Sequence, residues 1–117
     1  MGRPNRKQIL DAMQNAYTSS EGFFQNQLTL NGSLQQLSFP DDQDSSLLAT
    51  SVTVISDIEN ENYLYVGNSE TSETNFFAKI VPGDSVSINI DNPRHIYVLG
   101  TAGEIVTFGG ELFEWLR

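Results

Sequence analysis

The sequence predicts an all-β fold: a small antiparallel β-sandwich or jelly-roll-like barrel, preceded by an N-terminal helix and an extended arm. Candidate strands recur about every 10 residues between turn signals, a spacing typical of sandwiches and barrels rather than of βαβ units. Ser, Thr, Asn and Gln make up 37 of the 117 residues, while charged residues make up only 18%. That composition suits open strand faces better than the surface of a helix bundle.

The first predicted element is a helix over residues 5–17. Asn5 is a suitable N-cap, and the residues after it place apolar side chains at helical spacing. These apolar residues are Ile9, Leu10, Met13, Ala16 and Tyr17. A helix of about 13 residues is marginally stable alone in water, so we expect it to dock on its own domain or on a partner.

Residues 23–40 are predicted to form a β-hairpin, with an extended arm as the alternative. Asn31-Gly32 is a strong hairpin-turn signal because both residue types adopt positive φ readily. Pro40 ends the segment, and residues 41–46 form an acidic loop or linker. The predicted domains are therefore residues 1–46, the N-terminal helix plus arm or hairpin, and residues 47–117, a β-sandwich knob.

Seven strands are predicted within the knob. They cover residues 49–58, 63–67, 76–81, 85–91, 94–100, 104–108 and 111–116, and a short helix is the alternative for the last of them. Strict alternation of Val86, Ile88 and Ile90 with polar residues is the clearest strand signal. Residues 94–100 contain a nearly continuous apolar run, which predicts a central strand covered on both faces. Gly109-Gly110 is predicted to bend the chain between the last two strands.

Charge and composition exclude several classes of partner. The formal net charge of −9 argues against nucleic acid and anionic membranes, because both are themselves anionic. No apolar run approaches the ~20 residues that span a bilayer, and no apolar segment follows the N-terminal basic residues as in a secretory signal. The sequence has no cysteine, which excludes disulfides and cysteine-based zinc sites. We expect a soluble protein with no nucleic-acid or membrane partner.

No catalytic or metal-binding residue is predicted. His95 is the single histidine, and although Asp91 is close in sequence, no G-x-S-x-G nucleophile motif is present. Asp42 and Asp44 lack the glycine and the closing glutamate of a calcium loop. A small metal-dependent β-barrel enzyme is an alternative, but it would need several histidine ligands. We expect His95 to be a partly exposed strand residue, in a protein with neither enzyme activity nor a cofactor.

Six aromatic residues in the second half of the chain have two interpretations. They are Tyr63, Tyr65, Tyr97, Phe108, Phe113 and Trp115. The default interpretation is that such residues fill the core of a sheet protein. The alternative is a platform on which sugars stack, with Trp115 also a candidate interface anchor.

Basic residues concentrate at the N-terminus. Arg3, Arg6 and Lys7 are half of all Lys and Arg residues, so residues 1–7 carry a charge of +3 and the remainder carries −12. The segment is either a helix that caps the sandwich or a docking arm for an acidic partner with an apolar groove. On the second interpretation the partner-binding residues are Arg3, Arg6, Lys7, Ile9, Leu10, Met13 and Tyr17.

Three segments occur in an order that resembles a known class of proteins. Residues 65–69 are Tyr-Val-Gly-Asn-Ser, residues 82–86 are Pro-Gly-Asp-Ser-Val, and residues 96–101 are Ile-Tyr-Val-Leu-Gly-Thr. Together they resemble small virion proteins of tailed bacteriophages, several of which are capsid decoration (cement) proteins. The resemblance spans residues 50–108 and departs at residues 76–81, where a glycine and a single leucine would be expected.

The resemblance implies a capsid decoration protein on the outer surface of the virion, bound to the major capsid protein through its N-terminal arm. It implies no catalytic residue and no cofactor. Capsid lattices offer three-fold positions, and a small sandwich gains stability when neighbouring copies cover its edge strands, so we expect a homotrimer. The alternative is a phage tail, baseplate or fibre module that binds host glycans through exposed aromatic residues.

Overall fold

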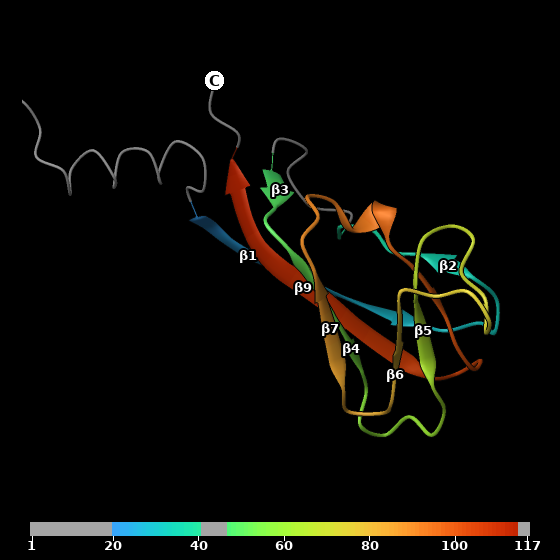
Figure 1. Cartoon of the computed structure of the whole chain (residues 1–117). Coiled ribbons are helices and arrows are strands. Elements are labelled where there is room, and N and C mark those ends of the chain that lie inside the picture. Colours follow the sequence, from blue (N-terminus) through green and yellow to red (C-terminus); the bar gives the residue numbers. More distant parts are fainter. Residues whose placement is uncertain (1–19, 41–46, 115–117) are drawn as a thin grey trace, which may run out of the picture.

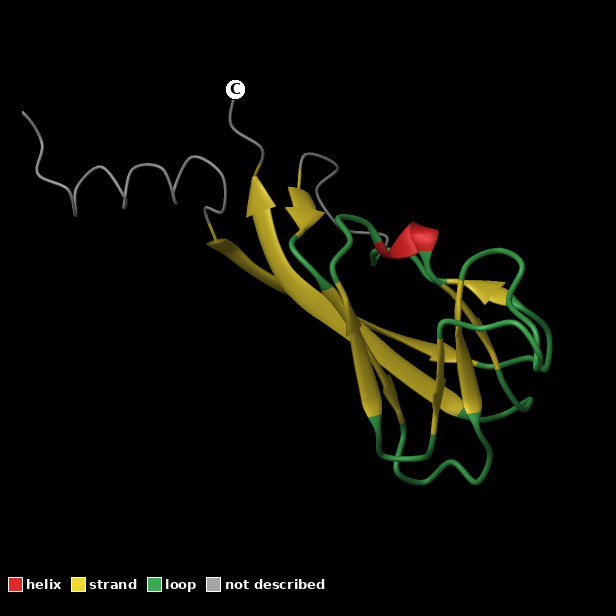
Figure 2. Cartoon of the chain, in the orientation of Figure 1, coloured by secondary structure: helices red, strands yellow, loops and turns green. Residues whose placement is uncertain are grey.

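Two antiparallel β-sheets pack face to face in the computed structural model, which describes residues 20–40 and 47–114 (Figure 1). In chain order the elements are β1 (Ser20–Thr29), β2 (Gln35–Gln36), β3 (Leu47–Ala49), β4 (Val52–Ser56), β5 (Leu64–Gly67), β6 (Ala78–Ile80), β7 (Ser85–Ile88), the short 3-10 helix η1 (Pro93–His95), β8 (Tyr97–Leu99) and β9 (Ile105–Glu114). The predicted all-β class is confirmed (Figure 2). The helix predicted over residues 5–17 lies outside the described residues.

The strand order of the two sheets is that of a jelly roll. Sheet A has the order β1-β9-β4-β7, and sheet B has the order β2-β8-β5-β6. The short strand β3 also pairs with β9, beyond the end of β4, so β3 and β4 together run along one side of β9. Two stacked sheets of four strands, counting β3 and β4 as one bent strand, are the double-sheet jelly-roll arrangement.

The predicted hairpin over residues 23–40 is wrong. β1 pairs with β9 in sheet A, whereas β2 pairs with β8 in sheet B. Gly32 has the expected positive φ of 86°, but the Asn31-Gly32 segment carries the chain from one sheet to the other. Two backbone hydrogen bonds hold this crossing: the Leu30 N–H donates to the Glu104 carbonyl and the Gly103 N–H donates to the Leu30 carbonyl, both at 2.8 Å.

The sandwich therefore begins earlier than the sequence indicates. The predicted boundary between residues 46 and 47 would separate β1 and β2 from β9 and β8, to which they are hydrogen-bonded. The physical reason is that an antiparallel strand needs a partner with a matching apolar face, and for β1 that partner is the last strand of the chain rather than its neighbour in sequence. Both β1 and β2 belong to the folded body.

Residues 94–100 form a turn and a short strand rather than one long strand. The Asn92 side chain accepts a hydrogen bond from the Arg94 N–H at 3.0 Å and so caps η1. β8 is central in sheet B, between β2 and β5, as predicted. It is not covered on both faces, because Val98 is buried while Tyr97 and Leu99 on the opposite face are only half-buried.

The last two predicted strands are one. β9 runs without a break through Gly109-Gly110, and Figure 1 shows it crossing the length of sheet A. The glycines allow close approach rather than a turn: a Cβ at Gly109 would overlap the Phe24 carbonyl oxygen, and one at Gly110 would overlap the Ser51 carbonyl oxygen. Backbone from both sides thus lies against the middle of β9.

The core between the sheets comes from alternating strand positions. Val54, Val66, Val98 and Val106 are completely buried, two from each sheet. Successive side chains of a strand point to opposite faces of its sheet, so the neighbours of these valines in the sequence point outward. The alternation predicted for residues 85–91 is observed in β7, where Val86 and Ile88 pack against the core and the serines are exposed.

Candidate functional site

The seven predicted partner-binding residues lie outside the residues that the structure describes. They are Arg3, Arg6, Lys7, Ile9, Leu10, Met13 and Tyr17. The described chain starts at Ser20, the first residue of β1, and β1 is an edge strand of sheet A.

The outer face of sheet A is polar and nearly free of charge. Cross-strand register places Gln27, Thr107, Ile55 and Ser85 in one row across four strands, all pointing away from the core. The next row contains Gln25, Gly109, Thr53 and Ser87. The Thr53 and Ser87 hydroxyls are hydrogen-bonded at 2.7 Å.

Two exposed apolar side chains border this face. Ile55 is 40% exposed and Phe23, near the start of β1, is 71% exposed. A shallow hollow lies between Ile55 and Phe23. Gly109 and Gly110 line it, together with Thr107 and Glu111. A sheet face with hydroxyl and amide groups, few charges and two large apolar side chains has the composition of a protein contact surface.

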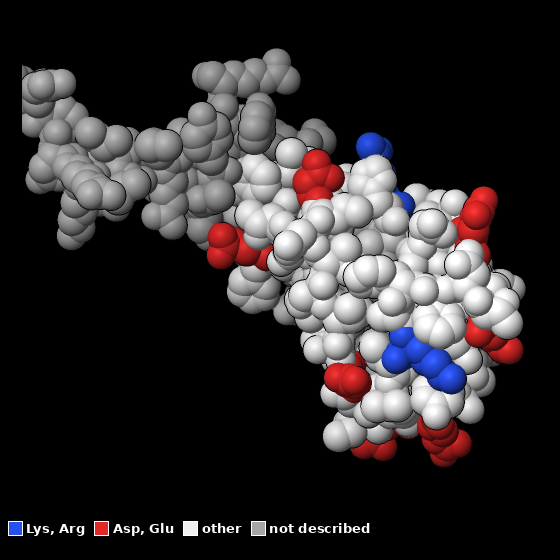
Figure 3. Space-filling model, viewed as in Figure 1, with Lys and Arg blue, Asp and Glu red and all other residues white. Residues whose placement is uncertain are grey.

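Acidic groups dominate the rest of the described surface. Eleven Asp and Glu residues occur in residues 20–40 and 47–114, against two basic residues, Lys79 and Arg94. Figure 3 shows acidic side chains at several separate places on one face of the body. Asp57, Asp84 and Glu104 lie in the loops that join β4 to β5, β6 to β7 and β8 to β9. Such a body repels anionic partners and attracts cationic segments.

One of these acids also shapes a loop. The Glu104 carboxylate accepts hydrogen bonds from the backbone N–H groups of Glu61, at 2.5 Å, and Asn62, at 3.3 Å. These bonds fix the end of the β4–β5 loop against the β8–β9 turn. The loop residues that follow therefore enter β5 from a defined position.

The structure divides the predicted aromatic platform. Phe108 and Phe113 are buried, Trp115 lies outside the described residues, and Tyr97 is half-buried on the outer face of sheet B. Tyr63, which is exposed, and Tyr65, which is half-buried, form a cluster with Phe76 and Lys79. The Phe76 ring centroid lies 5.3 Å from that of Tyr65, and the Lys79 Nζ lies 4.1 Å from the Tyr63 centroid.

Sequence reasoning missed Phe76 because residues 76–81 were predicted to be one strand. β6 begins only at Ala78, so Phe76 and Phe77 belong to the loop before it and are exposed. Two adjacent phenylalanines after a polar segment are the signal that was available: alternation would bury one of them, whereas a loop can present both.

His95 is the last residue of η1 and is exposed, so it is not the strand residue that was predicted. Within the described ranges, no group of three or more His, Cys, Asp or Glu side chains is placed to hold a metal ion. Among the same residues, no helix has the length and apolar character that crossing a membrane requires.

Comparisons with known proteins identify a distant structural neighbour. No protein-family model matches the chain, and no curated protein matches it. A solved structure described as "Bacillus endospore appendages form a novel family of disulfide-linked pili" is similar, with a TM-score of 0.49 and 17% sequence identity. The match covers 82% of this chain and 87% of that chain.

Proposed function

We propose that this protein is a structural protein of a bacteriophage virion, a capsid decoration (cement) protein that stabilises the head by binding the major capsid protein. The observation that supports this most is the separation of charge along the chain. Residues 1–7 carry +3, whereas the described body has eleven acidic residues against two basic ones. An acidic surface repels the acidic body but attracts a cationic segment. Such a segment can therefore attach the body to that surface.

The proposed binding arm is residues 1–19. It is shorter than the segment expected from the sequence because β1 and β2 are strands of the sandwich. Arg3, Arg6 and Lys7 contact acidic groups of the shell. Ile9, Leu10, Met13 and Tyr17 pack in an apolar groove of the same partner, in the way amphipathic helices bind grooves.

The proposed assembly is a homotrimer on the outer capsid surface. The outer face of sheet A supports it, because a nearly uncharged face can be buried without leaving unpaired charges. Among the described strands, β1 and β7 are the two edges of sheet A, and neighbouring copies can cover such edges. The proposal contains no catalytic step and no cofactor.

Removal of the arm tests the proposal. A chain beginning at Ser20 keeps all of β1, and we expect it to fold but not to bind empty capsids in a co-sedimentation assay. The triple change Arg3→Glu, Arg6→Glu and Lys7→Glu should abolish binding in the full-length chain. Arg94→Glu, on the exposed end of the body, is the matched control and should bind normally. Unchanged binding by the truncated chain would rule out the arm as the attachment site.

Copy number distinguishes the head from the tail alternative. Quantitative mass spectrometry of purified particles should give hundreds of copies for a shell protein. A tail, baseplate or fibre module would give only about three to twelve copies, because those structures follow low-order rotational symmetry. The lower count would favour the alternative function of host-glycan binding.

A further inference from the structure

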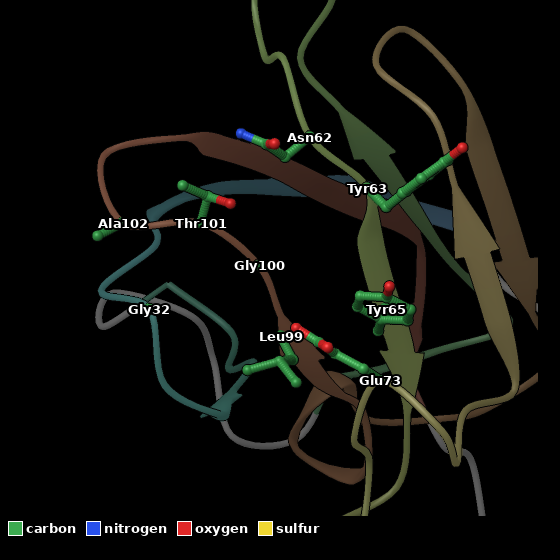
Figure 4. A pocket seen from close by; sticks show the side chains of 9 residues that line it. All are labelled: Gly32, Asn62, Tyr63, Tyr65, Glu73, Leu99, Gly100, Thr101 and Ala102. Carbon is green, nitrogen blue, oxygen red and sulfur yellow. The ribbon is translucent and has the colours of Figure 1, made fainter.

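A hollow of about 440 Å³ lies on the outer side of sheet B, beside the turn that joins β8 to β9. Its lining residues are Gly32, Asn62, Tyr63, Tyr65, Glu73, Leu99, Gly100, Thr101 and Ala102 (Figure 4). The residues come from four loops and from strands β5 and β8, which meet only in the folded chain. Its volume is within the range of small-ligand sites and accommodates one or two sugar rings.

One wall and the floor of the hollow are apolar. Tyr65 on β5 stands opposite Leu99 on β8 in the strand register, so the two side chains lie next to each other on the outer face. Gly100 also lines the hollow. A Cβ at this position would overlap the side chain of Leu30, which is buried in the core. The Phe76 ring packs beside the Tyr65 ring, with the two ring centroids 5.3 Å apart and the ring planes tilted by 53°. The tyrosine is therefore a preorganised platform.

Three polar side chains surround this apolar base. In Figure 4 the Glu73 carboxylate projects over Leu99 toward Gly100, while Asn62 and Thr101 lie on the far side of the opening. The Glu73 and Thr101 side chains make no hydrogen bond with any residue in the described ranges. The Asn62 amide nitrogen lies 3.5 Å from a Glu104 oxygen, which positions the side chain and leaves its amide oxygen available.

This combination matches the chemistry of a sugar ring. A pyranose has an apolar face of C–H groups, which is attracted to the electron-rich face of an aromatic ring. Its edge carries hydroxyl groups that both donate and accept. A carboxylate accepts from two adjacent hydroxyls, and an amide and a threonine hydroxyl supply both donors and acceptors.

The charge of the surroundings selects a neutral sugar. Glu73 lies within the hollow, and Glu61 and Glu104 lie in the adjoining loops. Lys79, whose Nζ lies 4.1 Å from the Tyr63 ring centroid and 5.8 Å from that of Tyr65, is one cation against these three carboxylates, so the surroundings stay net negative. Phosphorylated, sulfated or carboxylated sugars would be repelled there.

We propose that this hollow binds a single neutral hexopyranose, such as the terminal residue of a cell-surface glycan. Tyr65 stacks on the apolar face of the sugar, and Glu73, Asn62 and Thr101 hydrogen-bond its hydroxyls. The site goes beyond the proposed capsid attachment, since none of its residues belongs to the arm of residues 1–19. It would give a particle-bound copy a second, weak contact whose strength grows with copy number.

Titration of the ¹⁵N-labelled full-length chain with the methyl glycosides of glucose, galactose, mannose and N-acetylglucosamine tests the site. At least one should shift the amide resonances of residues 62–65, 73 and 99–102 while the rest of the spectrum stays unchanged. Because a single ring is a small ligand, dissociation constants of about 1 mM are expected, and the titration should reach about 50 mM.

Two variants and one control make the result specific. Tyr65→Ala and Glu73→Gln should each weaken binding about tenfold or more. Glu73 is exposed, so its variant keeps the fold, which the spectrum itself verifies. Phe77→Ala removes another aromatic ring, 69% exposed, that does not line this hollow, and this variant should bind like the unmodified chain.

Three outcomes would overturn the assignment. They are the absence of shifts with every glycoside, shifts that persist in both variants, and binding of methyl glucuronide as tight as that of the neutral glycosides. None of these outcomes bears on capsid attachment, which depends on the arm and is measured separately by co-sedimentation.

Discussion

Gly110 is the residue at which the fold is least tolerant of a side chain. A Cβ at this position would overlap the Ser51 carbonyl oxygen, which belongs to the backbone and cannot rotate away. We expect Gly110→Ala to lower the free energy of unfolding by about 3 kcal/mol, because neighbouring strands would have to separate. Urea denaturation of the purified chain measures this loss.

Gly103→Ala is the matched control for Gly110→Ala. Its φ is +90°, but nothing lies within 4 Å of an added Cβ. Gly103→Ala should lower the free energy of unfolding by only about 1–2 kcal/mol, because alanine is strained in a left-handed backbone conformation. Equal losses at the two positions would show that close approach is not what Gly110 provides.

Glycine has two structural uses that look the same in a sequence. Gly32, Gly83 and Gly103 have positive φ and lie in turns, as the sequence indicated. The Gly109-Gly110 pair does not have positive φ and lies inside a strand. Turn glycines are recognised from their neighbours in the chain, such as Asn31 or Pro82. A glycine that makes room for another strand is recognised only when that strand is in place.

At the scale of elements, β9 is the centre of sheet A. It pairs with β1 on one side over nearly its whole length, and with β4 and β3 on the other. We expect its amide hydrogens to exchange with solvent most slowly, since releasing them requires separation of strands on both sides. Hydrogen exchange followed by mass spectrometry should show slower exchange for residues 105–114 than for β7.

The comparison with β7 makes the exchange prediction specific. β7 is an edge strand of the same sheet and pairs only with β4 among the described strands. Similar protection of β7 and β9 in a dilute sample would contradict the prediction for an isolated chain. Strong protection of β7 that appears only at high protein concentration would instead indicate that another copy covers this edge.

At the scale of the whole molecule, the sandwich should be stable without its N-terminal segment. The buried residues of the described body pack against one another between the two sheets. We expect a chain beginning at Ser20 to melt within about 4 °C of the full-length protein, a difference of about 1 kcal/mol or less. Differential scanning calorimetry measures it, and a fall of more than about 10 °C would show that residues 1–19 complete the core.

Assembly is tested on the same two chains. Native mass spectrometry should give a trimer of the 13.0 kDa full-length chain if copies cover one another's edge strands. The chain beginning at Ser20 retains sheet A and its edges, so it should remain a trimer. A monomer in both cases would contradict the proposed homotrimer but would leave capsid attachment to be judged by co-sedimentation.

The sequence by itself determined the class of the fold and most of its strands. Alternation of apolar and polar residues, with Pro-Gly and similar turns between strands, is local information and identified β4 to β8. It also identified Tyr63 and Tyr65 as candidates for a surface platform, the alternative to a place in the core.

Only the tertiary structure decided which strands are partners and where the surface sites form. β1 pairs with β9 across about 80 residues of intervening chain, and the sugar-sized hollow joins Gly32, Tyr65, Glu73 and Thr101 from four separate segments. Such contacts depend on how apolar faces match when the two sheets pack. No short stretch of sequence determines this match. The residues of one strand determine which of its faces is apolar, but not which strand packs against that face.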